Sequence, residues 1–311
     1  MKRKTVAVVG PTASGKTSLG VHIAKKFDGE VISADSMQIY KGMDISTAKP
    51  TAEETDGVKH HLTDFLDISE TYSVSSFCKD AKTVFDGICQ RGKLPVIVGG
   101  TGLYIDSFIG NTAFFENASS SLIREELKNE LSEKGAEYMY SQLQSVDPES
   151  ALKIHPNNTV RVLRALEVFK TTGEPISRQV ALSHINGSDI EPLFIGITFS
   201  DRQKLYDRIN TRVDMMMERG LLAEAEMFFK SSPSKTAFNA IGCKEFKPYF
   251  DGEKSLDECV EDLKRDTRHY AKRQLTWFKR NSEINWIYPD TADYQEILAD
   301  VDNMINVFLG R

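Results

Sequence analysis

The sequence has few cysteines and no long apolar run, and both absences narrow the class of protein. Its four cysteines, Cys78, Cys89, Cys243 and Cys259, form no C-x-x-C pair, so there is no zinc or redox signature. No apolar stretch reaches the roughly 18 residues that a membrane-spanning helix needs. The apolar stretch 6–9 is too short for the h-region of a signal peptide. We therefore expect a cytoplasmic protein without a membrane partner.

The sequence also has fewer basic than acidic residues, which gives a net charge of −6 at pH 7. This value alone argues against a nucleic-acid-binding protein, because phosphate backbones favour basic surfaces. The charge is unevenly distributed along the chain, since residues 264–280 hold seven Lys or Arg and one Asp, a local charge of +6. The pattern fits an amphipathic helix that buries Tyr270, Trp277 and Phe278, and the spacing of the rings favours their burial. For the basic face we favour contact with a nucleic-acid backbone.

Short apolar runs alternate with helical patterns at both ends of the chain, which is typical of a parallel sheet buried on both faces. The region 117–187 is highly charged and helical, without a convincing strand. We predict an α/β fold with a P-loop core formed by 1–112 and 193–311 and a helical insertion at 113–192. The expected strands are 5–9, 30–33, 94–98, 193–199 and 284–288, and the clearest expected helices are 16–26, 200–220 and 255–280.

A phosphate-binding loop follows the first expected strand. The residues fit G-x-x-x-x-G-K-[ST] at every position: Gly10, Pro11, Thr12, Ala13, Ser14, Gly15, Lys16 and Thr17. The loop amides would converge on an anion at a helix N-terminus, Lys16 would contact terminal phosphates, and Thr17 would hold Mg²⁺. The strand before and the helix after disfavour an ordinary glycine turn. The motif predicts a polyphosphate or diphosphate ligand without specifying ATP.

The carboxylate that usually orders Mg²⁺ in an ATP-hydrolysing protein is missing after strand 95–98, where glycines and Thr101 follow. Asp35, after another strand, could be a metal ligand, a general base or a helix N-cap. The segment Asp35–Gln38 suits either an amino-bearing base edge or a capped turn.

Two arginine pairs and a histidine pair leave alternatives open. Arg208 and Arg212 can face a pyrophosphate or form helix-surface ion pairs with Asp201 and Asp207. Residues 161, 164 and 167 recur at helical spacing, as a solvated face or a phosphate-contacting face, and the residues alone slightly favour the former. We interpret His60 and His61 as polar or core histidines rather than metal ligands, because no third ligand has recognisable spacing.

Together these segments resemble the bacterial tRNA dimethylallyltransferase (tRNA isopentenyltransferase) family. The matching segments are Gly10–Thr17, Ala34–Tyr40, Gly42–Pro50, His60–Asp64, Pro95–Tyr104, Arg164–Val168, Ala240–Glu245 and Thr267–Lys279. They run in family order over nearly the whole chain. Departures are small: Met37 sits where the family varies, and Cys243 replaces a common aromatic residue.

The resemblance implies that N6 of adenosine 37 in a tRNA attacks C1 of dimethylallyl diphosphate and that pyrophosphate leaves. It assigns the diphosphate to Gly10–Thr17, Mg²⁺ to Thr17 and leaving-group stabilisation to Lys16. Asp35 would accept the N6 proton, and Thr101 would hydrogen-bond the bridging oxygen. Arg208 and Arg212 join the diphosphate site in our prediction.

The resemblance also implies that the base is flipped out of the anticodon stem-loop into this pocket, with the helical insertion closing as a mobile arm. The expected tRNA contacts are Asp35, Ser36, Met37, Gln38, Thr101, Arg124, Val160, Arg161, Val162, Leu163, Arg164, Arg268, Lys272 and Arg273. We expect a monomer. The competing functions are an adenylate isopentenyltransferase, a P-loop small-molecule kinase and a non-catalytic RNA-binding protein.

Overall fold

The computed structural model describes residues 2–112, 114 and 120–311 and divides the chain into two units. The first unit contains the residues up to Phe108 together with Asp189–Arg311, and the second is Ile109–Ser188. The boundaries expected from the sequence lie about four residues further along the chain at each junction.

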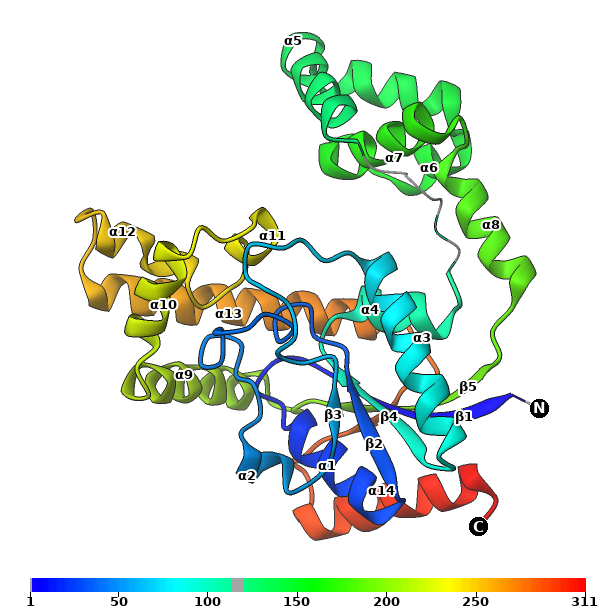
Figure 1. The fold of residues 1–311 in the computed structure, drawn as a ribbon, viewed down its shortest axis with the longest axis vertical. Helices are drawn as coiled ribbons and strands as arrows, with labels where there is room; N and C mark the ends of the chain where they lie inside the picture. The colour runs from blue at the N-terminus through cyan, green and yellow to red at the C-terminus, as the bar shows by residue number, and fades with distance from the viewer. Residues whose placement is uncertain (1, 113, 115–119) are drawn as a thin grey trace. The chain divides into compact units, whose positions relative to one another are not determined.

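The first unit is built on a six-stranded parallel sheet with the order β3-β2-β4-β1-β5-β6 (Figure 1). Its strands are β1 (Arg3–Val9), β2 (Gly29–Ser33), β3 (His60–His61), β4 (Leu94–Gly99), β5 (Ile190–Ile197) and β6 (Asn285–Ile287). Five strands confirm the prediction, with ends shifted by up to three residues. The sequence did not predict β3, because a strand of two residues leaves no pattern of alternation.

Helices cover both faces of the sheet. The first unit contains the helices α1 (Lys16–Lys26), α2 (Ala52–Thr55), α3 (Val74–Gln90), α4 (Gly102–Ile109), α9 (Arg202–Glu218), α10 (Leu221–Lys230), α11 (Lys235–Phe238), α12 (Lys247–Phe250), α13 (Leu256–Phe278) and α14 (Tyr294–Leu309), of which α10, α11 and α12 lie away from the sheet (Figure 1). Leu19 and Ile23 of α1 share one core with Val301 and Ile305 of α14. The connection through α3 runs along the sheet in the opposite direction to that through α1. Right-handed crossovers therefore place α3 on the other face.

The second unit is helical in its described part, as the sequence predicted. It contains α5 (Ser121–Val146), α6 (Pro148–Lys153), α7 (Thr159–Thr172) and α8 (Ile176–Asn186). Leu127, Leu143 and Leu166 belong to a core of its own, and α5 bends at Gly135, which has φ of 81°. The expected insertion also includes 113 and 115–119, which lie outside the described residues. Among the helices described, none is long and apolar enough to cross a membrane.

The carboxyl ends of β1, β2 and β4 meet at one edge of the sheet. Parallel strands end at the same edge, and open α/β sheets bind ligands there. The phosphate loop follows β1, Asp35 comes two residues after β2, and Thr101 comes two residues after β4. The topology alone therefore brings three predicted site segments together.

Candidate active site

The phosphate loop has the backbone geometry of an anion site. Gly15 is the N-cap of α1 with φ of 99°, and no side chain caps this helix. Gly10 has φ of 148°, and a Cβ there would lie 2.3 Å from the carbonyl oxygen of Ile197, so no larger residue fits. The first-turn amides of α1 are left to a ligand or to water, which is the arrangement that binds phosphate.

Ser14 supplies a second indication of an anion in this loop. Its side chain is 2% exposed, and its Oγ has no hydrogen-bond partner. A buried hydroxyl without a partner is unfavourable. A phosphate oxygen in the loop would accept the proton of this hydroxyl, so the residues present fit a diphosphate.

Three cations of the first unit face the loop. Lys16 donates from Nζ to the carbonyl of Pro11 at 2.6 Å, and Arg208 donates from Nε to the carbonyl of Ala13 at 3.0 Å. Arg212 Nη1 lies 3.5 Å from Oγ1 of Thr12. Burial, with a smaller contribution from Arg212, lowers the pKa of Lys16 to about 7, against the opposing effect of Asp35. Both α9 arginines thus point at the phosphate loop, which favours the pyrophosphate interpretation over the surface ion pairs.

Asp35 and Thr101 shape two neighbouring turns. Asp35 Oδ1 accepts hydrogen bonds from the backbone N–H groups of Met37 at 2.9 Å and Gln38 at 3.3 Å. No helix begins there, so Asp35 caps a turn rather than a helix. Thr101 Oγ1 accepts the backbone N–H of Ser36 at 3.1 Å and thereby joins its own turn to that of Asp35.

A cavity of about 280 Å³ in the first unit gathers these groups. Its polar lining includes Lys16, Thr17 and Asp35, with Ser36, Gln38, Arg212 and Arg273, and the apolar Met37 also lines it. An apolar wall is formed by Val98, Ile209, Val213, Met216 and Leu263. Thr101 is not among the lining residues and lies behind Ser36. The cavity can hold an anion and an apolar group next to each other.

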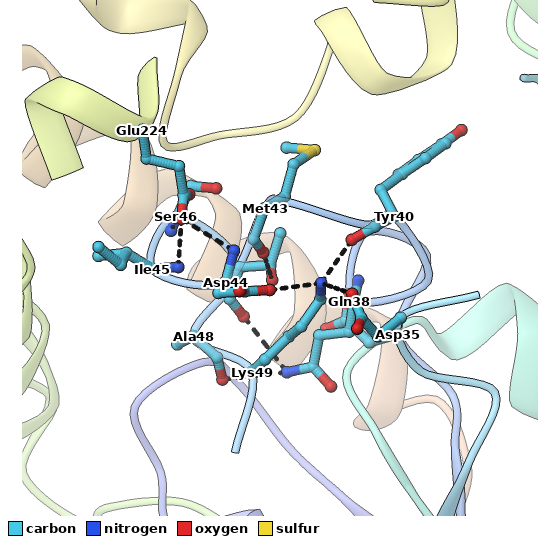
Figure 2. Close-up of polar contacts among 12 residues, drawn as sticks. Asp35, Gln38, Tyr40, Met43, Asp44, Ile45, Ser46, Ala48, Lys49 and Glu224 are labelled. Carbon is cyan, nitrogen blue, oxygen red and sulfur yellow. Dashed lines mark hydrogen bonds and ion pairs between the residues drawn. The ribbon is translucent and has the colours of Figure 1, made fainter. Parts of the chain in front are cut away.

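The side chain of Gln38 forms hydrogen bonds within the protein. Its Nε2 donates to the carbonyls of Thr47 and Ala48, each at 3.2 Å, and its Oε1 accepts from Ser33 Oγ at 3.2 Å. Figure 2 shows this side chain beneath the loop formed by residues 42–50, hereafter the 42–50 loop. Gln38 therefore holds the part of the loop that lines the cavity, a role that the sequence did not indicate.

Two buried charges fix the rest of the 42–50 loop (Figure 2). Glu224, at the start of α10 and 6% exposed, accepts the backbone N–H groups of Asp44, Ile45 and Ser46 at 2.7–2.9 Å. Lys49 donates to the Tyr40 carbonyl and to the carboxylates of Asp44 and Asp64. These contacts explain two of the matching segments, 42–50 and 60–64, without assigning them any ligand. The sequence shows Glu224 only as one acid of an amphipathic helix.

Helix α13 contacts the site with one side and solvent with the other. Gln274 is 6% exposed and hydrogen-bonds both the phosphate loop and the turn before Thr101. Tyr270 lines the cavity, and its pKa is raised to about 12, mainly by burial. The predicted burial of the rings is confirmed for Phe278, whereas Tyr270 and Trp277 are half-buried. The sequence analysis used the spacing of Tyr270 and Trp277 only as a sign of burial and did not identify this face as part of the site.

The basic charges of α13 divide into two groups. Lys264 pairs with Asp214 and Glu261, and Arg265 pairs with Asp262. Arg268 donates to Oδ1 of Asn210 at 2.6 Å, while Lys272 and Arg273 are exposed. The local charge of +6 is thus partly neutralised within the fold, and the surplus lies toward the second half of the helix.

In the second unit, Glu167 does not belong to a solvated face. It is 2% exposed and receives Arg124 Nη2 and Arg164 Nη1, each at 2.9 Å. Val162 is 1% exposed and packs in the core of the unit, so its side chain does not reach the surface, whereas Val160 is 78% exposed. Arg161 is exposed and Leu163 packs partly against the same core.

The histidines bind protein groups. His61 Nε2 lies 2.7 Å from Oε2 of Glu30, and His60 Nδ1 lies 3.0 Å from the Val58 carbonyl. In the part of the chain that the structure describes, no three acidic, cysteine or histidine side chains group as a metal site. Mg²⁺ still fits the cavity, because it commonly takes one or two protein oxygens and completes its shell with substrate phosphates and water. Thr17 and Asp35 are two of the oxygen donors that line it.

The strand order, the uncapped α1 and the phosphate loop define an α/β protein of the P-loop class. The family model described as IPP transferase matches residues 38–281, and that described as isopentenyl transferase matches residues 3–70. The chain belongs to the IPP transferase family, which confirms the resemblance that its motifs indicated.

Relatives match over the full length. The tRNA dimethylallyltransferase of Thermoanaerobacter sp. (strain X514) is 46% identical over 314 residues, covering 100% of this chain and 99% of the relative. That of Acetivibrio thermocellus is 49% identical over 293 residues, covering 94% and 93%.

Solved structures agree with the fold. The tRNA isopentenylpyrophosphate transferase of Bacillus halodurans has a TM-score of 0.73 at 43% identity, covering 98% of this chain and 96% of that chain. A eukaryotic dimethylallyltransferase acting on tRNA has a TM-score of 0.82 at 30% identity, covering 98% of this chain and 80% of that chain.

Proposed function

We propose that this enzyme transfers the dimethylallyl group of dimethylallyl diphosphate to N6 of adenosine 37 in the anticodon stem-loop of tRNA. Pyrophosphate is released. One observation carries the proposal: the phosphate-loop lysine, Lys16, and the carboxylate of Asp35 line a single cavity with an apolar wall. A diphosphate, a prenyl group and a proton acceptor have a place in this arrangement.

The donor's diphosphate binds to the loop amides and to Ser14, with Arg208 and Arg212 on its outer side. In the transfer step the C1–O bond breaks, and its electron pair stays on the diphosphate oxygen. Lys16 donates to the oxygens on which this charge grows. Donors that are already in place stabilise such charge most effectively.

The acceptor nitrogen forms its new bond to C1 and loses a proton. Asp35 takes the proton from N6, and the cap that it forms on the Met37–Gln38 turn fixes the direction of its carboxylate. Thr101 hydrogen-bonds the bridging oxygen in our assignment: its hydroxyl proton, directed at Ser36 Oγ at 3.4 Å, turns to the ligand while Oγ1 still accepts the backbone N–H of Ser36. Positioning matters here, because the N6 lone pair is delocalised into the ring and is a poor nucleophile.

Mg²⁺ is the metal that we propose, held by Thr17, and it supplies positive charge that offsets the diphosphate. Lys16 needs such support, since a lysine with a pKa of about 7 carries only part of a charge before its ligand binds. Asp35 also lies on this cavity and keeps its carboxylate for the N6 proton in our assignment.

The tRNA contacts are divided between the two units. In the first unit we assign them to Asp35–Gln38, Arg268, Lys272 and Arg273, with Gln38 acting through the 42–50 loop that its carboxamide holds. In the second we assign them to Arg124 and to Val160–Arg164, with Val162 acting through its backbone because its side chain is buried. We propose that the enzyme acts as a cytoplasmic monomer.

The test is a transfer assay with labelled dimethylallyl diphosphate and Mg²⁺, offering unmodified tRNA and AMP separately. Label in tRNA alone supports the proposal, label in AMP alone indicates an adenylate isopentenyltransferase, and label in neither favours a kinase. Asp35→Ala and Thr101→Ala should lose transfer but keep RNA binding. Asp207→Ala, an exposed change on α9, is the matched control.

A further inference from the structure

Gln274 joins two loops that strand pairing leaves apart. The pairing of β1 with β4 ends at Val9 and Gly99. Just beyond, Gln274 Oε1 accepts the backbone N–H of Thr12 at 2.8 Å, and its Nε2 donates to the carbonyl of Gly100 at 3.0 Å. The carboxamide thus extends the connection past the edge of the sheet, with an acceptor toward one loop and a donor toward the other.

The surroundings are built for this side chain. A Cβ on Gly100 would lie 2.1 Å from Gln274 Nε2, and a Cβ on Gly102 would lie 2.2 Å from the ring of Trp277. One turn earlier on α13, Ala271 belongs to the same buried apolar cluster as Ala13 of the phosphate loop. Helix α13 therefore fits closely against this region at Ala271, Gln274 and Trp277, and Gln274 supplies the hydrogen bonds to both loops.

We propose that Gln274 is a positioning residue for prenyl transfer, which sets the phosphate loop relative to the turn that carries Thr101. This inference rests on the proposed function, in which the loop holds the diphosphate and Thr101 hydrogen-bonds the oxygen of the breaking C1–O bond. The two groups act on opposite ends of one leaving group, so their separation must match it. A displacement of about 1 Å at such a site can lower a rate on the order of 100-fold.

Two variants test this role in the full-length enzyme. Gln274→Met keeps the bulk but removes both hydrogen bonds, and we expect kcat to fall on the order of 10- to 100-fold with the KM for tRNA within about twofold. Gln274→Glu restores the pair only when protonated, because a carboxylic acid can accept from Thr12 and donate to Gly100. Deprotonated, its second oxygen faces the Gly100 carbonyl and repels it.

The ratio of Gln274→Glu to wild-type kcat should therefore rise on the order of tenfold from about pH 8 to about pH 6. A side chain that only fills space gives no such trend. Gln203→Met, at an exposed position of α9 where the side chain of Gln203 donates to Asp207 Oδ1, should match wild type throughout.

Wild-type kcat in Gln274→Met, or a pH-independent ratio for Gln274→Glu, overturns the inference. Melting temperatures of both variants separate a loss of folding from a loss of rate. If the wild type itself transfers nothing to tRNA, the proposed function fails instead. The two failures are thus told apart in one set of assays.

Discussion

Glu224 Oε1 accepts the backbone N–H of Ser46 at 2.8 Å, although 178 residues separate the two in the chain. The neighbouring amides of Asp44 and Ile45 bind the other carboxylate oxygen. Glu224→Gln should destabilise the fold by about 1–3 kcal/mol, because an amide N–H₂ would face backbone donors in a buried place. Chemical denaturation measures the loss.

Glu226→Gln is the control, since Glu226 lies on the same helix, is half-exposed and pairs with Lys230. Equal stabilities of the two variants would contradict the anchoring role of Glu224. We also expect Glu224→Gln to reduce transfer, because Ser46 and Thr47 line the cavity.

The pKa of Lys16, about 7, couples diphosphate binding to protons. A bound anion favours the charged lysine and raises this pKa, so binding takes up protons and weakens as pH rises above about 7. Calorimetry of pyrophosphate binding in buffers of different ionisation enthalpy measures the uptake. Lys16→Met should bind weakly and reveals the uptake due to the ligand alone; an equal proton count in both proteins would refute the coupling.

The lowered pKa of Lys16 also makes the stability of the folded protein depend on pH. The folded pKa of about 7 lies below the ordinary lysine pKa of 10.5, so between these pH values the unfolded chain binds more protons at Lys16. The unliganded protein should therefore gain stability from this group as pH rises through that window. Lys16→Met should lack that part of the gain.

Glu30 contributes to the stability of the fold, and this contribution is lost in acid. Burial favours its neutral form, but hydrogen bonds from Arg91 and His61 prevail and lower its pKa to about 2. Its contribution is fully present above the ordinary glutamate pKa of 4.5 and is lost as pH falls toward 2. The stability difference between wild type and Glu30→Gln, on the order of 1–3 kcal/mol at pH 6, should shrink across that window. A constant difference in acid unfolding would contradict the assignment.

The basic side chains in the second half of α13 should contribute to RNA binding. Replacing Arg268, Lys272 and Arg273 together by Gln should weaken tRNA binding. The negative slope of the log association constant against log salt should become shallower by about 0.7–0.9 per lost phosphate contact. Lys264→Gln with Arg265→Gln is the control, because both residues are already paired with acids. An unchanged slope in the triple variant would leave the helix with a structural role.

Glu167 positions two of the proposed tRNA contacts. Removing its charge in Glu167→Gln weakens the ion pairs that orient Arg124 and Arg164, so the KM for tRNA should rise several-fold while the KM for dimethylallyl diphosphate stays the same. Glu174→Gln, near the end of α7, is a control on an exposed pair with Arg178. A rise in both KM values would contradict a role confined to the tRNA contacts.

Features carried by contiguous residues were predictable from the sequence. The phosphate loop occupies 10–17, and its strand, glycines and helix are all local signals. The expected helix 16–26 is observed with the same ends, because the loop fixes its start. The parallel sheet followed from short apolar runs that leave no polar face.

Contacts between distant residues were not predictable. Gln274 lies 262 residues from Thr12, and a glutamine on an amphipathic helix has no pattern that names its partner. Glu167 appeared as one of three charged positions at helical spacing, and only the packing of α5 against α7 shows that it is buried. The neutralisation of Lys264 likewise depends in part on Asp214, an acid of α9.

The central position of β1 has a consequence for synthesis. It is the first strand to be made, yet it pairs on one side with β4 and on the other with β5, and the whole second unit is translated between them. At about 5–20 residues per second, the edge of β1 that later pairs with β5 therefore stays unpaired for several seconds during synthesis. The second unit has its own core and can fold during the wait. A pause in translation within that unit would therefore prolong exposure of an edge on which nascent chains can aggregate.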